Sequence, residues 1–261
     1  MKKGIAVFDS GIGGITFLRD AVRTLPSENF IYYADTDHVP YGTKPDDEVR
    51  RFVGAAVAFL EQQGIKALVI ACNAATSAAV AELRKQYSFP IIGMEPAVKP
   101  ALEYAGHRKV LVFSTSLTAR GHKLKSLICR LQKEHQIVTL PFDELVRTAE
   151  AFDFDSLAVR GIIREKLASL DLNAFGAVVL GCTHFIYYRP LIEEVLPEGI
   201  CVFDGNRGTL KNLVRTLALQ DADRTPDRGK ITFYTSGRVP DDALSAKLAE
   251  LIIAPSSGSE R

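Results

Sequence analysis

The stretch Ala67-Leu-Val-Ile-Ala-Cys72-Asn73 decides the fold expected for this chain, because Ala177-Val-Val-Leu-Gly-Cys182-Thr183 repeats its pattern. Each stretch is an uninterrupted apolar run that ends in a small residue, a cysteine and a residue with a hydrogen-bonding side chain. Apolar runs without polar alternation indicate strands that are buried on both faces, as in parallel sheets. Each cysteine then lies at the carboxyl end of its strand, where open α/β sheets bind ligands. A lone cysteine is more often a small buried hydrophobe, but the doubled context favours two thiols that face one substrate from opposite sides.

The two cysteine stretches belong to a degenerate repeat of the whole chain. Each half is expected to contain a strand with a polar turn, a second strand, a strand ending in cysteine and a fourth strand. The strand ends Phe8-Asp9 and Phe113-Ser114 recur at nearly the same offset as the cysteines, and this period is too long for a solenoid. The sequence therefore predicts an α/β protein of two pseudo-symmetric three-layer domains. Each has a mostly parallel sheet flanked by helices, and the active site lies in the cleft between them.

The domain boundaries are predicted where the repeat begins again. Residues 1–97 together with 211–261 are expected to form the first domain, and residues 98–210 the second, so that each domain carries one cysteine stretch. A late strand at 230–236 has no counterpart in the repeat, and we expect the chain to return to the first domain there. Besides the two cysteine runs, strands are expected at 4–8, 29–34, 90–93, 109–113, 136–140 and 200–203, and helices at 15–25, 46–63, 74–86, 121–133, 142–151, 155–169, 210–219 and 241–253. The segment 221–229 is expected to be a charged linker and 255–261 a frayed tail.

The composition of the 261 residues is that of an ordinary globular enzyme, with 47% apolar and 24% charged residues. A net charge of +1 gives no reason to expect nucleic acid or an anionic membrane as a partner. The N-terminal apolar run is too short for a signal peptide or a membrane span, so we expect a cytoplasmic protein. The four cysteines lack the spacing of a zinc site, so no metal is expected. We assign Cys129 and Cys201 to packing.

Two acid–base groups on opposite faces of one carbon atom suit the inversion of a stereocentre. One group removes a proton, and the other supplies one from the far side. Each cysteine is expected near a helix N-terminus, which favours the thiolate. Each also has its own neighbour for moving protons: Asp9 lies at the adjacent strand end, and His184 follows Cys182 by two residues. Taken alone, Asp9 is equally typical of a turn and His184 of a structural hydrogen bond.

Hydrogen-bond donors are needed for the charge that develops on a substrate carboxylate when its Cα proton leaves. The turn Gly11–Gly14 after the first strand suits a close approach of backbone to a ligand, or an anion at the following helix. It lacks the lysine of a P-loop. The side chains available as donors are those of Ser10, Asn73, Thr115, Thr118 and Thr183.

Five fragments of the chain resemble glutamate racemases. They are Asp9-Ser-Gly-Ile-Gly-Gly14, Pro40-Tyr41-Gly42, Cys72-Asn73, Gly181-Cys-Thr-His184 and Phe233-Tyr-Thr-Ser-Gly237. They occur in family order and cover nearly the whole chain, and they are specific only jointly. The resemblance implies a cofactor-independent enzyme of two pseudo-symmetric α/β domains. Such an enzyme converts L-glutamate to D-glutamate for peptidoglycan synthesis, and thus for cell-wall biogenesis and cell shape.

The resemblance also implies roles for individual residues. Cys72 and Cys182 are the two bases, each serving one enantiomer, while Asp9 assists the first and His184 the second. The substrate is held by Ser10, Tyr41, Gly42, Asn73 and Thr183. Glu150 matches an acidic position of the family only loosely, and is equally typical of a solvated helix charge.

The sequence departs from the family pattern at three places. Ala74 stands where the family usually has threonine, which leaves only a backbone N–H to bind substrate unless Thr76 compensates. Losing one donor to a charged group weakens binding by ~1.5–3 kcal/mol. Phe185-Ile186 replaces Tyr-Pro, and Asp204-Gly-Asn206 is an unusual end for the fourth strand.

We therefore expect an isomerase that racemises glutamate. One alternative is a racemase of aspartate or a hydantoin, and another is a catalytically silent paralogue that binds an acidic amino acid or a protein. A third is a nucleotide-binding module built on Gly11–Gly14. A homodimer is left open, because the sequence does not determine the oligomeric state.

Overall fold

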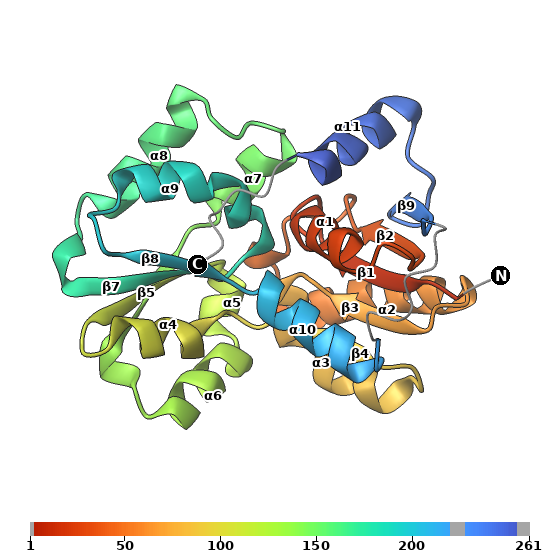
Figure 1. Ribbon diagram of the computed structural model, residues 1–261, viewed down its shortest axis with the longest axis horizontal. Coiled ribbons are helices and arrows are strands. Elements are labelled where there is room, and N and C mark those ends of the chain that lie inside the picture. The colour runs from red at the N-terminus through yellow and green to blue at the C-terminus, as the bar shows by residue number, and fades with distance from the viewer. Residues whose placement is uncertain (1–2, 220–227, 255–261) are drawn as a thin grey trace.

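Two parallel sheets flanked by helices form this protein, as the computed structural model of residues 3–219 and 228–254 shows (Figure 1). One sheet has five strands and the other four, and Figure 1 shows them in separate halves of the molecule. This arrangement confirms the predicted fold class. Most of the predicted linker at 221–229 and the tail at 255–261 lie outside the described residues.

The first domain has a five-stranded sheet between two layers of helices. The order of its strands is β4 (Ile91–Gly93), β3 (Ala67–Ile70), β1 (Ile5–Asp9), β2 (Phe30–Ala34) and β9 (Ile231–Thr235). One face packs on α2 (Asp46–Gln62) and α3 (Asn73–Gln86). The other packs on α1 (Ile15–Thr24), α10 (Asn206–Thr216) and α11 (Asp242–Ile253). The 3₁₀ turn η1 (Tyr41–Thr43) leads from the end of β2 toward α2.

The second domain repeats this plan with four strands. Their order is β8 (Cys201–Asp204), β7 (Phe175–Leu180), β5 (Lys109–Ser114) and β6 (Ile137–Pro141). One face packs on α4 (Val98–Ala105) and α6 (His122–Leu131). The other packs on α7 (Glu144–Glu150), α8 (Leu157–Leu167), α9 (Arg189–Val195) and the 3₁₀ segment η4 (Thr183–Tyr188). The remaining short helices are α5 (Ser116–Arg120), η2 (Glu134–Gln136) and η3 (Leu172–Ala174).

The internal repeat is confirmed by the strand order. Strands β4, β3, β1 and β2 of the first sheet lie side by side in the same order as strands β8, β7, β5 and β6 of the second. When the strands of each domain are numbered along the chain, both orders are fourth, third, first and second. In each sheet the strand before the cysteine pairs with the first strand, with Phe8 beside Ile70 and Phe113 beside Leu180. As expected, β9 has no counterpart and adds to β2 in the first sheet.

The chain passes between the domains at two places that touch each other. The first crossing follows β4 at residues 94–97, and the second follows β8 at residues 204–206. A Cβ atom added to Gly205 would lie 2.6 Å from Met94 Cγ and 3.0 Å from the Glu95 carbonyl oxygen. Glycine is therefore required there by the close approach of the two crossings.

Several local predictions differ from the structure. Helix α10 begins four residues before its predicted start, because Asn206 ends the second crossing and its N–H is held by Asp204 Oδ1 at 2.9 Å. It spans the predicted domain boundary at residue 210 and packs against α1 and β4. Cys129 is exposed on the outer side of α6, so its predicted role in packing is wrong. No helix within residues 3–219 and 228–254 combines the length and apolarity needed to cross a bilayer.

A glycine in β7 tests the packing of α4 on the second sheet. A Cβ at Gly176 would lie 2.9 Å from Ala105 Cα, so Gly176→Ala should lower the free energy of unfolding by about 1–3 kcal/mol through overpacking. The matched control is Gly54→Ala inside α2, where a Cβ meets no atom within 4 Å. That change should raise stability by about 0.5–1 kcal/mol. Urea unfolding measures both, and equal shifts would contradict the proposed contact.

Candidate active site

A small pocket lies between the two domains, and both predicted cysteines line it. The first domain contributes the turn after β1, the η1 turn and the start of α3. The second contributes α5, α7 and the start of η4. The lining residues are Ser10, Tyr41, Gly42, Cys72, Asn73, Ala74, Thr115, Thr118, Val146, Cys182 and His184.

Three predicted residues lie behind the pocket wall rather than in it. Asp9, Glu150 and Thr183 do not line the pocket, although each bonds to another predicted residue or to the turn that carries Ser10. Val146 is a lining residue that the sequence did not single out, since an apolar position on a helix gives no signal beyond packing.

Cys72 is held as a buried thiol at the start of α3. Its Sγ accepts a hydrogen bond from Ala75 N at 3.4 Å, and its thiol donates to Ser10 Oγ at 3.6 Å. Burial raises the pKa of Cys72 above its ordinary value, and the charge of Asp9 adds to this effect. The N–H of Ala75 at the start of the helix favours the thiolate, as expected, but desolvation outweighs this contribution.

Cys182 has a basic partner instead. Its Sγ lies 3.7 Å from Nδ1 of His184, and Nε2 of that ring lies 2.5 Å from Glu150 Oε1. Burial alone lowers the pKa of His184, but its bonds to Cys182 and Glu150 outweigh burial and raise this pKa well above its ordinary value. The two thiols thus have opposite surroundings: a carboxyl group lies near Cys72, and a proton-holding imidazole lies beside Cys182.

Asp9 links the two domains beneath the pocket. It is fully buried and accepts hydrogen bonds from Gly11 N at 3.1 Å and from Thr183 Oγ1 at 3.0 Å. Burial raises the pKa of Asp9 to about 6, although the charge of His184 lowers it. Asp9 therefore titrates close to neutral pH, which suits a group that exchanges protons with its surroundings.

The glycine turn after β1 is the surface on which the second domain sits. A Cβ at Gly11 would lie 1.8 Å from Glu150 Oε1, and one at Gly13 would lie 2.4 Å from Thr183 Oγ1. Ile12 N donates to Glu150 Oε1 at 2.8 Å. These contacts fill the space that a phosphate would need at Gly11 and Gly13. The glycine turn, which suggested the nucleotide-binding alternative, therefore no longer supports it.

Comparison with known proteins identifies the family of this chain. The Asp/Glu/Hydantoin racemase family matches residues 14–213 of this chain. The chain belongs to that family. A glutamate racemase of Halothermothrix orenii is 46% identical over 246 residues, which are 94% of this chain and 97% of that protein.

Solved structures of racemases from the same family share the whole fold. The glutamate racemase of Thermus thermophilus, in complex with beta-chloro-D-alanine, superimposes with a TM-score of 0.76 at 32% identity and covers 96% of this chain and 93% of its own. The Escherichia coli glutamate racemase, in complex with L-glutamate, superimposes with a TM-score of 0.80 at 28% identity and covers 95% of each chain.

The departures from the racemase pattern have structural explanations. Phe185 and Ile186 are buried in the core of the second domain, where Phe185 packs on Phe142. Ala74 lines the pocket, but the Thr76 hydroxyl donates to the Ile70 carbonyl at 3.0 Å and faces away from it. Thr76 therefore does not compensate for the missing hydroxyl at position 74.

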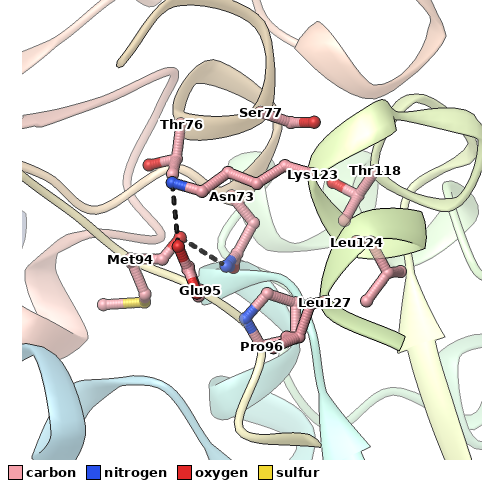
Figure 2. Close-up of a pocket in the computed structure, with 10 residues that line it drawn as sticks. All are labelled: Asn73, Thr76, Ser77, Met94, Glu95, Pro96, Thr118, Lys123, Leu124 and Leu127. Atoms are coloured by element: carbon pink, nitrogen blue, oxygen red, sulfur yellow. Dashed lines mark hydrogen bonds and ion pairs between the residues drawn. The ribbon is translucent and has the colours of Figure 1, made fainter. Parts of the chain in front are cut away.

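A second small pocket lies on the other side of Asn73 and Thr118 (Figure 2). Figure 2 shows the Asn73 amide directed at the Met94 carbonyl, to which it donates at 3.3 Å. It also shows an ion pair from Lys123 Nζ to Glu95 Oε1, 3.0 Å long. Asn73 is thus fixed by the first crossing, and the second domain is tied to that crossing by Lys123.

Tyr41 is held in the pocket wall by a residue that the sequence analysis missed. Asp35 accepts a hydrogen bond of 2.5 Å from the Tyr41 hydroxyl. It also bonds to His38 Nδ1 at 2.9 Å and accepts from Ser236 Oγ at 3.1 Å. A signal was present, since Asp35 follows the end of β2 as Asp9 ends β1 at the same sheet edge.

The raised pKa of Asp9 predicts how stability depends on pH. The unfolded chain releases this proton near pH 3.8 and the folded chain near pH 6. The folded state binds the proton more tightly, so its stability falls as the pH rises through this range, by about 3 kcal/mol. Asp9→Asn cannot titrate. Its unfolding free energy, relative to the parent chain, should be about 2 kcal/mol higher at pH 8 than at pH 4, because the unfolded carboxyl is already partly ionised at pH 4.

Urea unfolding of both proteins at the two pH values measures this difference. Asp37→Asn is the matched control and should show almost no difference between pH 4 and pH 8, because Arg238 lowers the pKa of that exposed carboxylate and its titration lies below this range. The assignment to Asp9 is contradicted if Asp9→Asn and its parent lose stability in parallel between pH 4 and pH 8.

Proposed function

We propose that this protein racemises glutamate at Cα by a two-base mechanism without a cofactor. The observation that carries the proposal is the pair of thiols, brought from separate domains, that line one small pocket with opposite electrostatic surroundings. Relatives named glutamate racemase over nearly the full chain support glutamate as the substrate.

In the proposed reaction one thiolate removes the Cα proton while the other cysteine, as a thiol, supplies a proton to the opposite face. Asp9 assists Cys72 and His184 assists Cys182, so each cysteine has a neighbouring group that adjusts its protonation. Reaction in the opposite direction exchanges the two roles. A desolvated pocket with fixed donors lowers the barrier, because negative charge develops on the substrate carboxylate.

The substrate is proposed to be held by pocket-lining groups at both walls. Asn73 and the N–H of Ala74 lie in the first turn of α3, where N–H groups have no partner within the helix and suit an anion. Thr115 and Thr118, which share a 3.1 Å hydrogen bond, face them from α5. Ser10, Tyr41 and Gly42 complete the set. Behind the wall, Thr183 is proposed to orient Asp9, and Glu150 to orient His184.

The decisive test is exchange of the Cα proton. In deuterated water, each glutamate enantiomer should acquire deuterium at Cα and convert to the other, as followed by NMR. Cys72→Ser and Cys182→Ser should each lower the rate at least ~10²-fold, because each removes an acid–base group. Cys129→Ser, at an exposed cysteine outside the pocket, is the matched control and should leave the rate unchanged. Normal racemisation in either pocket variant would sink the two-thiol mechanism.

The same measurement separates the alternatives. Faster turnover of aspartate or a hydantoin than of glutamate would assign the chain to another activity of the family. Binding of an acidic amino acid without any exchange at Cα would favour a catalytically silent paralogue.

The alanine at position 74 predicts weaker substrate binding than a threonine would give. Ala74→Thr adds a hydroxyl to the pocket wall beside Cys72 and should lower the KM for glutamate about tenfold, since a hydrogen bond to a charged group contributes ~1.5–3 kcal/mol. Ala74→Val has the same shape without the hydroxyl and serves as the control. Equal KM values for the two variants would mean that position 74 acts only through volume.

Three further expectations accompany this function and stay predictions. The first is a cytoplasmic location, with D-glutamate passing to peptidoglycan synthesis. The second is a possible homodimer. The third is the division of the chain into a first domain of residues 1–97 with 211–261 and a second domain of residues 98–210.

A further inference from the structure

Two adjacent tyrosines at the end of η4 direct their hydroxyls to different domains. Tyr187 donates to the Ile12 carbonyl at 2.8 Å, which lies in the glycine turn of the first domain. The Tyr188 hydroxyl stays within the second domain, where it bonds to the Thr148 hydroxyl at 2.6 Å and donates to the Asp153 carbonyl at 3.0 Å. The proposed mechanism uses neither of them.

The hydrogen bond from Tyr187 is one of two that the second domain makes to the backbone of Ile12; we call this pair the Ile12 clamp. Ile12 is 2% exposed. Its N–H is held by Glu150 Oε1 at 2.8 Å, and its carbonyl is held by Tyr187. The second domain therefore grips Ile12 on both sides of its backbone. The neighbouring Gly11 carbonyl accepts a bond of 2.6 Å from Tyr32 of the first domain, so the turn is anchored from both domains.

Through Glu150, the Ile12 clamp is connected to His184 and Cys182. The oxygen of Glu150 that accepts from Ile12 is the same oxygen that bonds to His184 Nε2. The other ring nitrogen of His184 faces Cys182 Sγ at 3.7 Å. A shift of Ile12 therefore moves the carboxylate that orients the imidazole, while the ring of Tyr187 is itself fixed against Phe154 at 4.7 Å between centroids.

We propose that Tyr187 is a positioning residue that couples the seating of the two domains to the proton transfer at Cys182, through Ile12, Glu150 and His184. This inference rests on the proposed function. Tyr187 is not one of the residues that line the pocket, and it acts by fixing the turn that Glu150 contacts. Burial raises the pKa of Tyr187 well above its ordinary value, so its phenol remains a donor throughout the working pH range.

The test compares Tyr187→Phe with Tyr188→Phe. Each variant removes one hydroxyl from the same segment, but only the first breaks a bond between domains. Tyr187→Phe should lower kcat/KM for glutamate about tenfold, whereas Tyr188→Phe should change it less than twofold. Both should remain folded, as judged by circular dichroism and thermal melting.

A kinetic isotope effect distinguishes positioning from a general loss of structure. With α-deuterated glutamate, slowing of the step at Cys182 alone should raise the isotope effect on kcat/KM for the enantiomer that Cys182 deprotonates and lower it for the other. General loosening would leave the two effects in their original ratio. The double variant Tyr187→Phe with Glu150→Gln should be no slower than Glu150→Gln alone, because both changes act through one carboxylate.

Each outcome decides the inference separately from the proposed function. If the unmodified protein does not racemise glutamate, the proposed function fails. If it does, and Tyr187→Phe matches Tyr188→Phe in rate and isotope effects, the inference is overturned and the function stands. A Tyr187→Phe chain that does not fold while Tyr188→Phe folds would also overturn it, because the hydroxyl would then serve the fold rather than proton transfer.

Discussion

The contact between the glycine turn of the first domain and η4 of the second is the constraint on which the site depends. Gly11 and Gly13 lack side chains where Glu150 and Thr183 approach the backbone. This close approach brings the carboxyl ends of two separate sheets to one pocket. Without it, each cysteine would be a buried residue at the end of its own strand, with no partner across a cleft.

The same contact makes the site electrically asymmetric although the fold is nearly symmetric. Equivalent strand ends place Cys72 and Cys182 in equivalent positions, but Asp9 and His184 give them neighbours of opposite character. A symmetric pair of thiols would have identical neighbours for proton transfer. The asymmetry gives them different ones, a carboxyl group near Cys72 and an imidazole 3.7 Å from the Cys182 sulfur.

How much the sequence predicts depends on whether a feature is local. The apolar runs before Cys72 and Cys182 were sufficient to predict two parallel sheets and a shared pocket, because burial on both faces leaves a clear pattern. The hydrogen bond of the Thr76 hydroxyl was not predictable, since it depends on how that side chain is turned in the assembled domain, whereas the position of Asp35 after a strand end was a signal that was overlooked. The 3₁₀ segment η4 and the short helix α5 were missed because neither is long enough to show a helical period. The sequence predicted that the backbone of the turn Gly11–Gly14 lies close to a ligand, whereas in the structure it lies close to the second domain.

The two crossings between the domains meet at Gly205, which lies against Met94 and Glu95. Two separate links would allow the halves to slide past each other or to part evenly. Links that meet at a single point leave rotation about that point as the main motion between the domains. Any widening of the cleft for glutamate to enter would then be largest far from this hinge point and smallest beside Asn73, which is bonded to Met94 next to it. The wall at Asn73 would thus keep its shape while the opposite wall swings away.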